Sequence, residues 1–242
     1  MTGTAKASHN HLLAALRPEV QQRVFPKLKL RNLRLGSVVY EAGQNETHVY
    51  FPTDCIISLL YVMENGASAE ISVVGNEGVV GIAVFMGGDS TPSEAIVQSA
   101  GSAYRLPATE LRKEFNADPD MRMLMLRYTQ ALITQMAQTA VCNRHHSIDQ
   151  QLCRWLLLSL DRLRGKELTM TQELIANMLG VRREGVTVAA HKLQDLGVIT
   201  YQRGHIEVLD RPRLEELCCE CYAVVRRETE RLEAYAQQQR SR

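Results

Sequence analysis

The segment 169–209 constrains the fold more than any other part of this 242-residue chain. Its first part predicts a short helix that Thr171 caps and Gly180 ends. A second helix is expected over residues 182–196, and the sequence VITYQRGHIEVL after it alternates like a hairpin that turns at Arg203-Gly204. Two helices, a glycine turn between them and a hairpin after them predict a winged helix-turn-helix, which is more specific than a helix-turn-helix pattern alone.

The second of these helices has an apolar and a polar side. Steps of three and four residues predict that five positions are buried: Val186, Ala189, Ala190, Leu193 and Leu196. On the other side, Arg183 can donate to guanine O6 and N7, and Glu184 can accept from the amino group of cytosine. Thr187 and Val188 suit contacts with a thymine methyl group, so these four residues are the predicted base contacts. Contacts with the DNA backbone are predicted for Thr171, Gln172, Arg182, His191, Lys192 and Arg203.

A long stretch after Pro107, DPDMRMLMLRYTQALITQMAQTAVCNRHH, has no glycine and no internal proline beyond its start, and it predicts a helix over residues 119–142. At 1.5 Å per residue this helix would be about 35 Å long, which exceeds one face of a small barrel. We therefore expect its stripe to pair with a second copy of the chain, with two polar positions fixing the register, although packing on its own β domain is the alternative. The predicted dimer interface is Met121, Leu124, Tyr128, Leu132, Gln135, Thr139 and Cys142.

Before this helix, residues 33–107 contain short β-branched runs separated by glycines, which predicts an antiparallel jelly roll or barrel. Asn65-Gly66 predicts a two-residue hairpin turn in which both positions have positive φ. The expected fold is α+β: an N-terminal β-roll sensor domain (1–118), a dimerisation helix and hinge (119–146), and a C-terminal winged helix-turn-helix DNA-binding domain (147–242).

This order of elements, together with the sequence TQELIANMLGVRREGV, resembles the cyclic-AMP receptor protein and fumarate-nitrate regulator (Crp/Fnr) superfamily over almost the whole chain. The resemblance implies a bacterial transcription regulator that binds a pseudo-palindromic operator as a homodimer, with RNA polymerase as a partner. It places the family's Arg-Glu pair on Arg183 and Glu184. A further arginine of the cyclic-AMP-responsive members falls on Val188, so their operator sequence does not carry over.

The resemblance also locates an effector pocket. Cyclic-nucleotide binders of the family use a Gly-Glu pair and a later Arg-Ser or Arg-Thr pair, whereas here Ile82 follows Gly81, and Ser93 and Glu94 stand near the place of the arginine. Without a guanidinium, and with Glu94 repelling phosphate, we predict no tight binding of cyclic AMP. The N-terminal cysteine cluster of the iron-sulfur relatives is missing from this sequence. Another small-molecule effector stays open, as does haem, whose candidate axial ligands are His9, His11 and His48.

Composition narrows the location and the chemistry. A net charge of +1 gives no evidence for a nucleic-acid partner, and no run approaches the roughly 18 apolar residues of a membrane span. Since MTGTAKASHNH also lacks the apolar stretch of a secretory signal, we expect a cytoplasmic protein. Cys218, Cys219 and Cys221 lie close together, but no second ligand pair follows at zinc-site spacing, so we predict core thiols and no metal.

Two alternatives come from other classes of protein. The chain could be a cupin-like β-roll with a metal, or a protein-interaction module whose winged helix does not bind DNA. A cupin site needs several histidines and a carboxylate on neighbouring strands, and His48 is the only histidine in residues 33–107. The sequence therefore predicts that the protein is not an enzyme.

Overall fold

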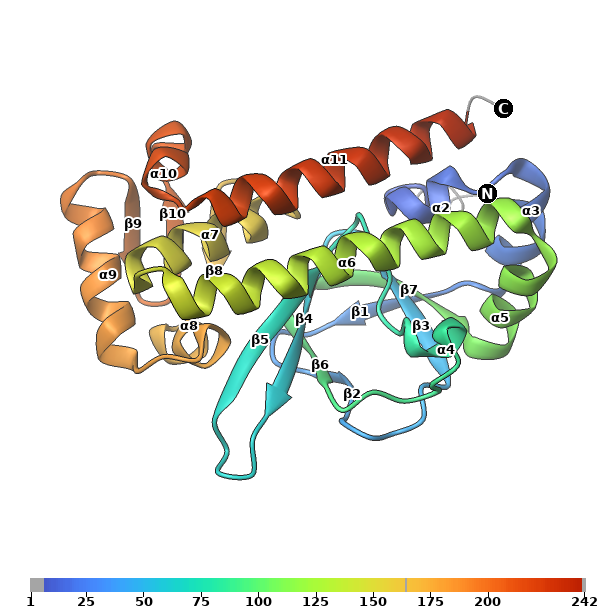
Figure 1. Cartoon of the computed structure of the whole chain (residues 1–242), viewed down its shortest axis with the longest axis horizontal. Helices are drawn as coiled ribbons and strands as arrows, with labels where there is room; N and C mark the ends of the chain where they lie inside the picture. Colours follow the sequence, from blue (N-terminus) through green and yellow to red (C-terminus); the bar gives the residue numbers. More distant parts are fainter. Residues whose placement is uncertain (1–6, 164, 241–242) are drawn as a thin grey trace.

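The structure of the chain is a computed structural model that describes residues 7–163 and 165–240. Figure 1 shows a β-roll below the long helix α6 (Pro119–His145) and a winged-helix lobe at the C-terminal end of that helix. Residues 1–6, on which the expectation about a secretory signal partly rests, lie outside this description. Among the described residues, no helix combines the length and the apolar character that crossing a membrane requires.

The β-roll consists of two antiparallel sheets, as predicted. One sheet has the strand order β2-β6-β4-β5 and the other has the order β1-β7-β3. Phe51, Ile57 and Leu106 are fully buried in its core. The bounds are β1 (Lys29–Leu33), β2 (Val38–Tyr40), β3 (His48–Pro52), β4 (Ile56–Val62), β5 (Ser68–Val74), β6 (Glu94–Ser99) and β7 (Gly101–Pro107), with helix α4 (Ala83–Met86) between β5 and β6.

The hairpin between β4 and β5 differs from the predicted two-residue turn. The carbonyl of Met63 accepts from Gly66 N at 2.8 Å, and Met63 N donates to the carbonyl of Ala67 at 2.7 Å. Within this loop only Gly66 has a positive φ, at 81°. The connection is therefore a three-residue loop with the glycine in the left-handed position, and Asn65 contributes its side chain, which accepts from Ala67 N.

Short helices cover the far end of the β-roll. Asp118 caps α6 by accepting from Met121 N at 2.8 Å, and it also pairs with Arg17. The cap explains why α6 begins directly after it, because Pro119 can occupy the first helical position without losing a hydrogen bond. The elements at this end are α2 (His11–Ala15), α3 (Pro18–Val24), the 3-10 helix η1 (Phe25–Lys27) and α5 (Ala108–Ala117).

The winged helix-turn-helix agrees with the prediction. Thr171 caps α8, Gly180 ends it with a φ of 65°, and the wing turns at Arg203 and Gly204, both with positive φ. Two details differ: Leu196 is 48% exposed, and an unpredicted strand joins the wing by pairing with β10. The elements are α7 (Ile148–Leu160), β8 (Glu167–Thr169), α8 (Gln172–Leu179), α9 (Arg183–Asp195), β9 (Ile199–Gln202), β10 (His205–Val208) and α10 (Arg211–Leu217).

The C-terminal helix α11 (Glu220–Arg240) leaves the winged-helix lobe and runs along α6 back to α2 (Figure 1). Near its start, Tyr222 and Val225 belong to the core of the winged-helix lobe. Farther along, Leu232 and Ala236 belong to the core of the β-roll. The expected division assigned residues 147–242 to the DNA-binding domain, but α11 is shared by both lobes.

Candidate nucleic-acid interface and effector pocket

Helix α9 is held against the winged-helix core by its apolar side. Val186, Ala189, Ala190 and Leu193 are each at most 2% exposed. A Cβ atom at Gly185 would lie 2.7 Å from Cδ1 of Ile148, so the glycine allows α7 and α9 to approach closely. The opposite side of α9 consequently faces solvent at a fixed angle to the rest of the lobe.

The four predicted base-contacting residues lie on two parts of that side. Arg183, Glu184 and Val188 are exposed, and Val188 reaches 67%, which is high for a valine in a helix. Among the described residues, neither Arg183 nor Glu184 has an ion-pair partner within 4.0 Å. Thr187 differs, since it is half-buried and its hydroxyl donates to Oε1 of Gln172 at 2.7 Å, which ties α9 to α8. Three of the four side chains are thus exposed together on α9, and the fourth, Thr187, is engaged in a contact between α8 and α9.

The predicted backbone-contacting residues surround this face. Arg182 is exposed at the N-cap of α9, His191 is exposed on α9, and Arg203 is exposed at the tip of the wing. Thr171 uses its hydroxyl to cap α8. Lys192 already pairs with Asp149 of α7, so its ammonium group has a partner within the chain.

The structure corrects the predicted dimer interface on α6. All seven residues are buried inside the single chain, with exposures between 0% for Cys142 and 7% for Thr139. The hydroxyl of Tyr128 donates to the carbonyl of Val79 at 2.9 Å, and Gln135 donates to the carbonyl of Val73 at 3.2 Å. The β-roll and α11 cover this stripe. The alternative interpretation, packing within the chain, is therefore the correct one for these seven residues, and they are not available to a second copy.

A different stripe of α6 remains exposed. Its residues recur at steps of three and four along the helix, with two adjacent residues at its end, and four apolar members are between 41% and 50% exposed. We call it the outer stripe; it consists of Met123, Leu126, Gln130, Ile133, Ala137, Ala140 and Val141.

The predicted effector residues lie beside an unusual carboxylate. Gly81 adopts a φ of 105°, and a Cβ atom there would lie 3.2 Å from Oε2 of Glu46. Glu46 is 7% exposed, and neither of its oxygens has a hydrogen-bond partner in the described residues. Ser93 is buried and contacts the hydroxyl of Thr91, while Ile82 and Glu94 are half-buried. The surroundings of Gly81 therefore contain a buried acid where a cyclic phosphate would need a cation.

Burial raises the pKa of Glu46 from 4.5 to about 7. Between these values the folded protein holds more protons than the unfolded chain, so this group makes stability fall as pH rises from about 4.5 to 7. We expect Glu46→Gln to be more stable than the parent at pH 8 by about 3 kcal/mol, at about 1.4 kcal/mol per pKa unit, and to show a smaller difference at pH 5. Urea unfolding at both pH values measures this.

The exposed Glu64 provides the control, because Glu64→Gln should leave the pH dependence of the parent unchanged. Part of that dependence should survive in Glu46→Gln, since burial also raises the pKa of Glu70 to about 7. Identical pH profiles for Glu46→Gln and the parent would contradict the assignment.

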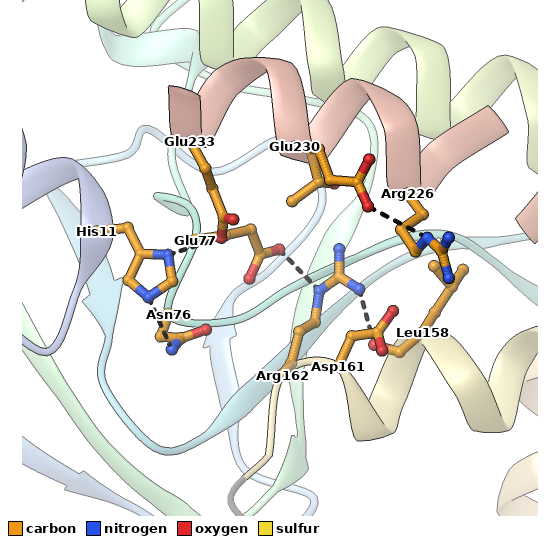
Figure 2. Close-up of a pocket in the computed structure, with 10 residues that line it drawn as sticks. His11, Asn76, Glu77, Leu158, Asp161, Arg162, Arg226, Glu230 and Glu233 are labelled. Atoms are coloured by element: carbon orange, nitrogen blue, oxygen red, sulfur yellow. Dashed lines mark hydrogen bonds and ion pairs between the residues drawn. The ribbon is translucent and has the colours of Figure 1, made fainter. Parts of the chain in front are cut away.

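A cavity of about 250 Å³ lies elsewhere, between the β-roll, α7 and α11. Figure 2 shows Arg162 and Glu77 at its inner wall, joined by an ion pair of 2.7 Å. At its other side, His11 lies between Asn76 and Glu233 and contacts both with its ring nitrogens. None of the predicted effector residues lines this cavity. The cavity was not predicted from sequence, because one of its walls is formed by α11, whose packing against the β-roll was not predicted.

These features define a class of protein: a cyclic-nucleotide-binding type of β-roll joined by a long helix to a winged helix-turn-helix. The family model described as cyclic nucleotide-binding domain matches residues 30–118, and the model described as Crp-like helix-turn-helix domain matches residues 150–217. The chain belongs to the Crp/Fnr family of transcriptional regulators, as the sequence resemblance predicted.

Solved structures show the same fold at low sequence identity. A putative Crp/Fnr regulator from Eubacterium rectale is 17% identical, with a TM-score of 0.68 over 87% of this chain and 98% of that one. FixK2 from Bradyrhizobium japonicum is also 17% identical, with a TM-score of 0.67 over 79% and 98%. The c-di-GMP responsive regulator CLP from Xanthomonas campestris is 15% identical, with a TM-score of 0.63 over 80% and 100%. A comparison with curated protein sequences finds no match.

Proposed function

We propose that this chain regulates transcription as a homodimer that binds a pseudo-palindromic operator through α9. The observation that carries the proposal is the exposed face formed by Arg183, Glu184 and Val188 on a helix whose other side is buried. Arginine and glutamate together suit a G·C step, and valine suits a thymine methyl group in the major groove. Arg182, His191 and Arg203 flank this face, where they can contact phosphates.

A second copy of the chain is the proposed occupant of the outer stripe. Apolar residues at alternating steps of three and four are typical of a helix that packs on another helix. One polar member, Gln130, can fix the register of the pair, while Ala137 and Ala140 allow close approach. Two-fold pairing along α6 would direct both α9 helices toward one side of a duplex, with half-sites about 34 to 36 Å apart.

The specificity of Arg183→Ala tests the proposal. We expect this variant to lose about 1 to 3 kcal/mol of discrimination at one G·C position in each half-site. Selection from a random duplex pool would define the operator, and fluorescence anisotropy with single-base variants would measure the loss.

Arg182→Ala is the matched control, because it removes the neighbouring exposed arginine, to which we assign a phosphate contact and no base contact. This variant should weaken binding to all DNA sequences alike, and the slope of log affinity against log salt concentration should become shallower by about one. Equal losses on every sequence for Arg183→Ala would remove its base-contacting role, and a parent protein without any sequence preference would refute the proposed function.

Three further parts of the proposal follow from family membership: RNA polymerase as a partner, a small-molecule effector of the β-roll, and action in the cytoplasm. The buried Glu46 beside Gly81 supports the expectation that this effector is not cyclic AMP. Haem is another candidate group for the β-roll, and His11 is the least suited of its candidate axial ligands, because both of its ring nitrogens already contact other side chains.

A further inference from the structure

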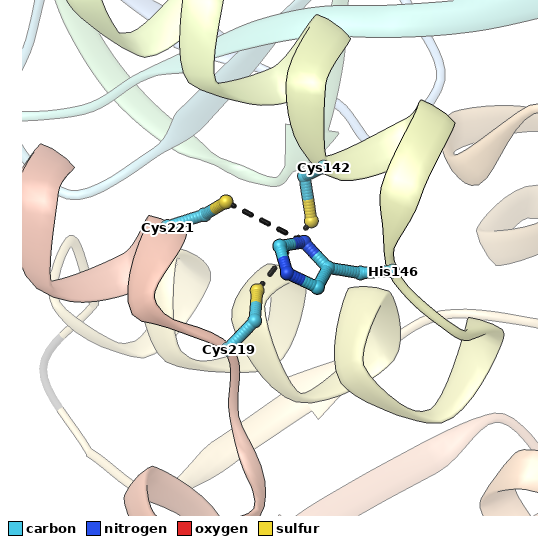
Figure 3. A group of neighbouring side chains, drawn as sticks. All are labelled: Cys142, His146, Cys219 and Cys221. Atoms are coloured by element: carbon cyan, nitrogen blue, oxygen red, sulfur yellow. Dashed lines mark hydrogen bonds between the residues drawn. The ribbon is translucent and has the colours of Figure 1, made fainter.

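Four metal-ligating side chains meet where α6 ends and α11 begins. Cys142 lies in the last turn of α6 and His146 caps that helix, while Cys219 precedes α11 and Cys221 lies in its first turn. Figure 3 shows the three thiols around the ring of His146. Their four ligand atoms all lie within 4.8 Å of one another, and the three cysteines are buried.

The distances fit one tetrahedral ion. The sulfurs of Cys142 and Cys219 are 3.6 Å apart, and the sulfur of Cys221 is 3.6 Å from Nδ1 of His146. Zinc bonds of about 2.3 Å to sulfur and 2.0 Å to nitrogen place tetrahedral ligands about 3.5 to 3.8 Å apart. A cluster of several irons would divide the thiolates among different metal atoms and hold them farther apart.

The surroundings of the four residues also suit a metal. His146 directs Nδ1 toward the thiols, and its Nε2 lies 3.3 Å from a carboxylate oxygen of Glu220. Such a carboxylate behind a histidine is the usual outer partner in zinc sites, where it orients the ring.

A buried cation lies beside the same group. Arg154 is 4% exposed, its Nε has no hydrogen-bond partner in the described residues, and its Nη1 donates at 3.2 Å to the hydroxyl of Thr139, one turn of α6 before Cys142. Three thiolates, a neutral histidine and a divalent ion carry a net charge of −1, which this guanidinium would balance. A buried charge is stabilised by such a partner.

We propose that Cys142, His146, Cys219 and Cys221 bind one zinc ion. The ion would fasten the start of α11 to the end of α6, directly beside Ser147, the N-cap of α7. It would thus fix the hinge between the long helix and the winged-helix lobe. This proposal does not depend on DNA binding.

Metal titration of the full chain tests the proposal. Protein purified with reductant should contain one zinc per chain, and after chelation it should bind Co²⁺ with the visible absorption of a tetrahedral thiolate site, which Zn²⁺ then abolishes. Cys219→Ser should lower zinc affinity by more than 100-fold, and Glu220→Gln, which changes only the outer partner, by about 10- to 100-fold. Cys218→Ser is the matched control, because this neighbouring thiol lies outside the four-ligand group and its loss should leave the affinity unchanged.

Several results would overturn the proposal. They are a reduced parent protein that binds no Zn²⁺ or Co²⁺ tightly, equal losses for Cys218→Ser and Cys219→Ser, and iron with inorganic sulfide in place of zinc. A disulfide between Cys142 and Cys219 in protein kept reduced would do the same. If Cys219→Ser does not fold, the Co²⁺ spectrum of the parent and the affinity of Glu220→Gln still decide the question.

Discussion

Ile133→Glu is expected to convert the proposed dimer into a monomer and to lower affinity for a two-half-site operator by about 100- to 10,000-fold, the range in which linked binding exceeds single-site binding. Ile133 lies in the middle of the outer stripe and is 50% exposed in the single chain. In a two-fold pair of α6 helices, the two new carboxylates would come close together and lose water. Light scattering would measure the mass, and anisotropy would measure binding to full and half operators.

Gln138→Glu is the control, since it adds the same charge on α6 beside the stripe at a half-buried position. It should remain dimeric. The stability of both variants as folded chains should be similar, because neither side chain belongs to the buried face of α6. A dimer that persists in Ile133→Glu would show that the second copy binds elsewhere.

The position of α6 was predictable from sequence, but its partners were not. The helix has two stripes with helical spacing: one through Leu124, Tyr128 and Leu132, and one through Leu126 and Ile133. Periodicity shows that a face is apolar without showing what covers it. The prediction assigned the first stripe to a second copy because it did not include α11, which covers it together with the β-roll.

The winged helix was predicted most accurately because its signals are local. The cap at Thr171, the left-handed glycine at Gly180 and the Arg203-Gly204 turn each depend on a few neighbouring residues. The third strand of the wing was missed, since β8 is only three residues long and owes its place to pairing with β10.

The cysteine cluster was not predicted, because its members are far apart in sequence. The sequence prediction looked for a second ligand pair after Cys221. In the structure the second pair comes from earlier in the chain, at Cys142 and His146, and Cys142 is 77 residues before Cys219. A cysteine and a histidine four residues apart at a helix end, Cys142 and His146, were the available signal. Cys142 lies in the last turn of α6 and His146 is its C-cap, and both belong to the four-ligand group, whereas His145 is exposed.

Arg162→Ala is expected to lower the free energy of unfolding by about 3 to 5 kcal/mol, the loss typical of breaking a buried ion pair. Arg162 and Glu77 join α7 to the β-roll at 2.7 Å, and their side chains are 6% and 10% exposed. The arginine also donates to the carbonyl of Leu158, and Glu77 accepts from Gly75 N. Urea unfolding monitored through the single tryptophan, Trp155, would measure the change.

The size of this effect should depend on the charge left behind. Arg162→Ala leaves the Glu77 carboxylate buried without a cation, whereas the double variant Arg162→Met, Glu77→Gln leaves no charge and should recover most of the loss. Arg213→Ala, which breaks an exposed pair with Glu216, should cost less than about 1 kcal/mol. If the double variant were as unstable as Arg162→Ala, the loss would come from packing against Gly75 and not from the unpaired charge. Recovery in the double variant would instead identify this ion pair as the electrostatic link between the β-roll and the winged-helix lobe.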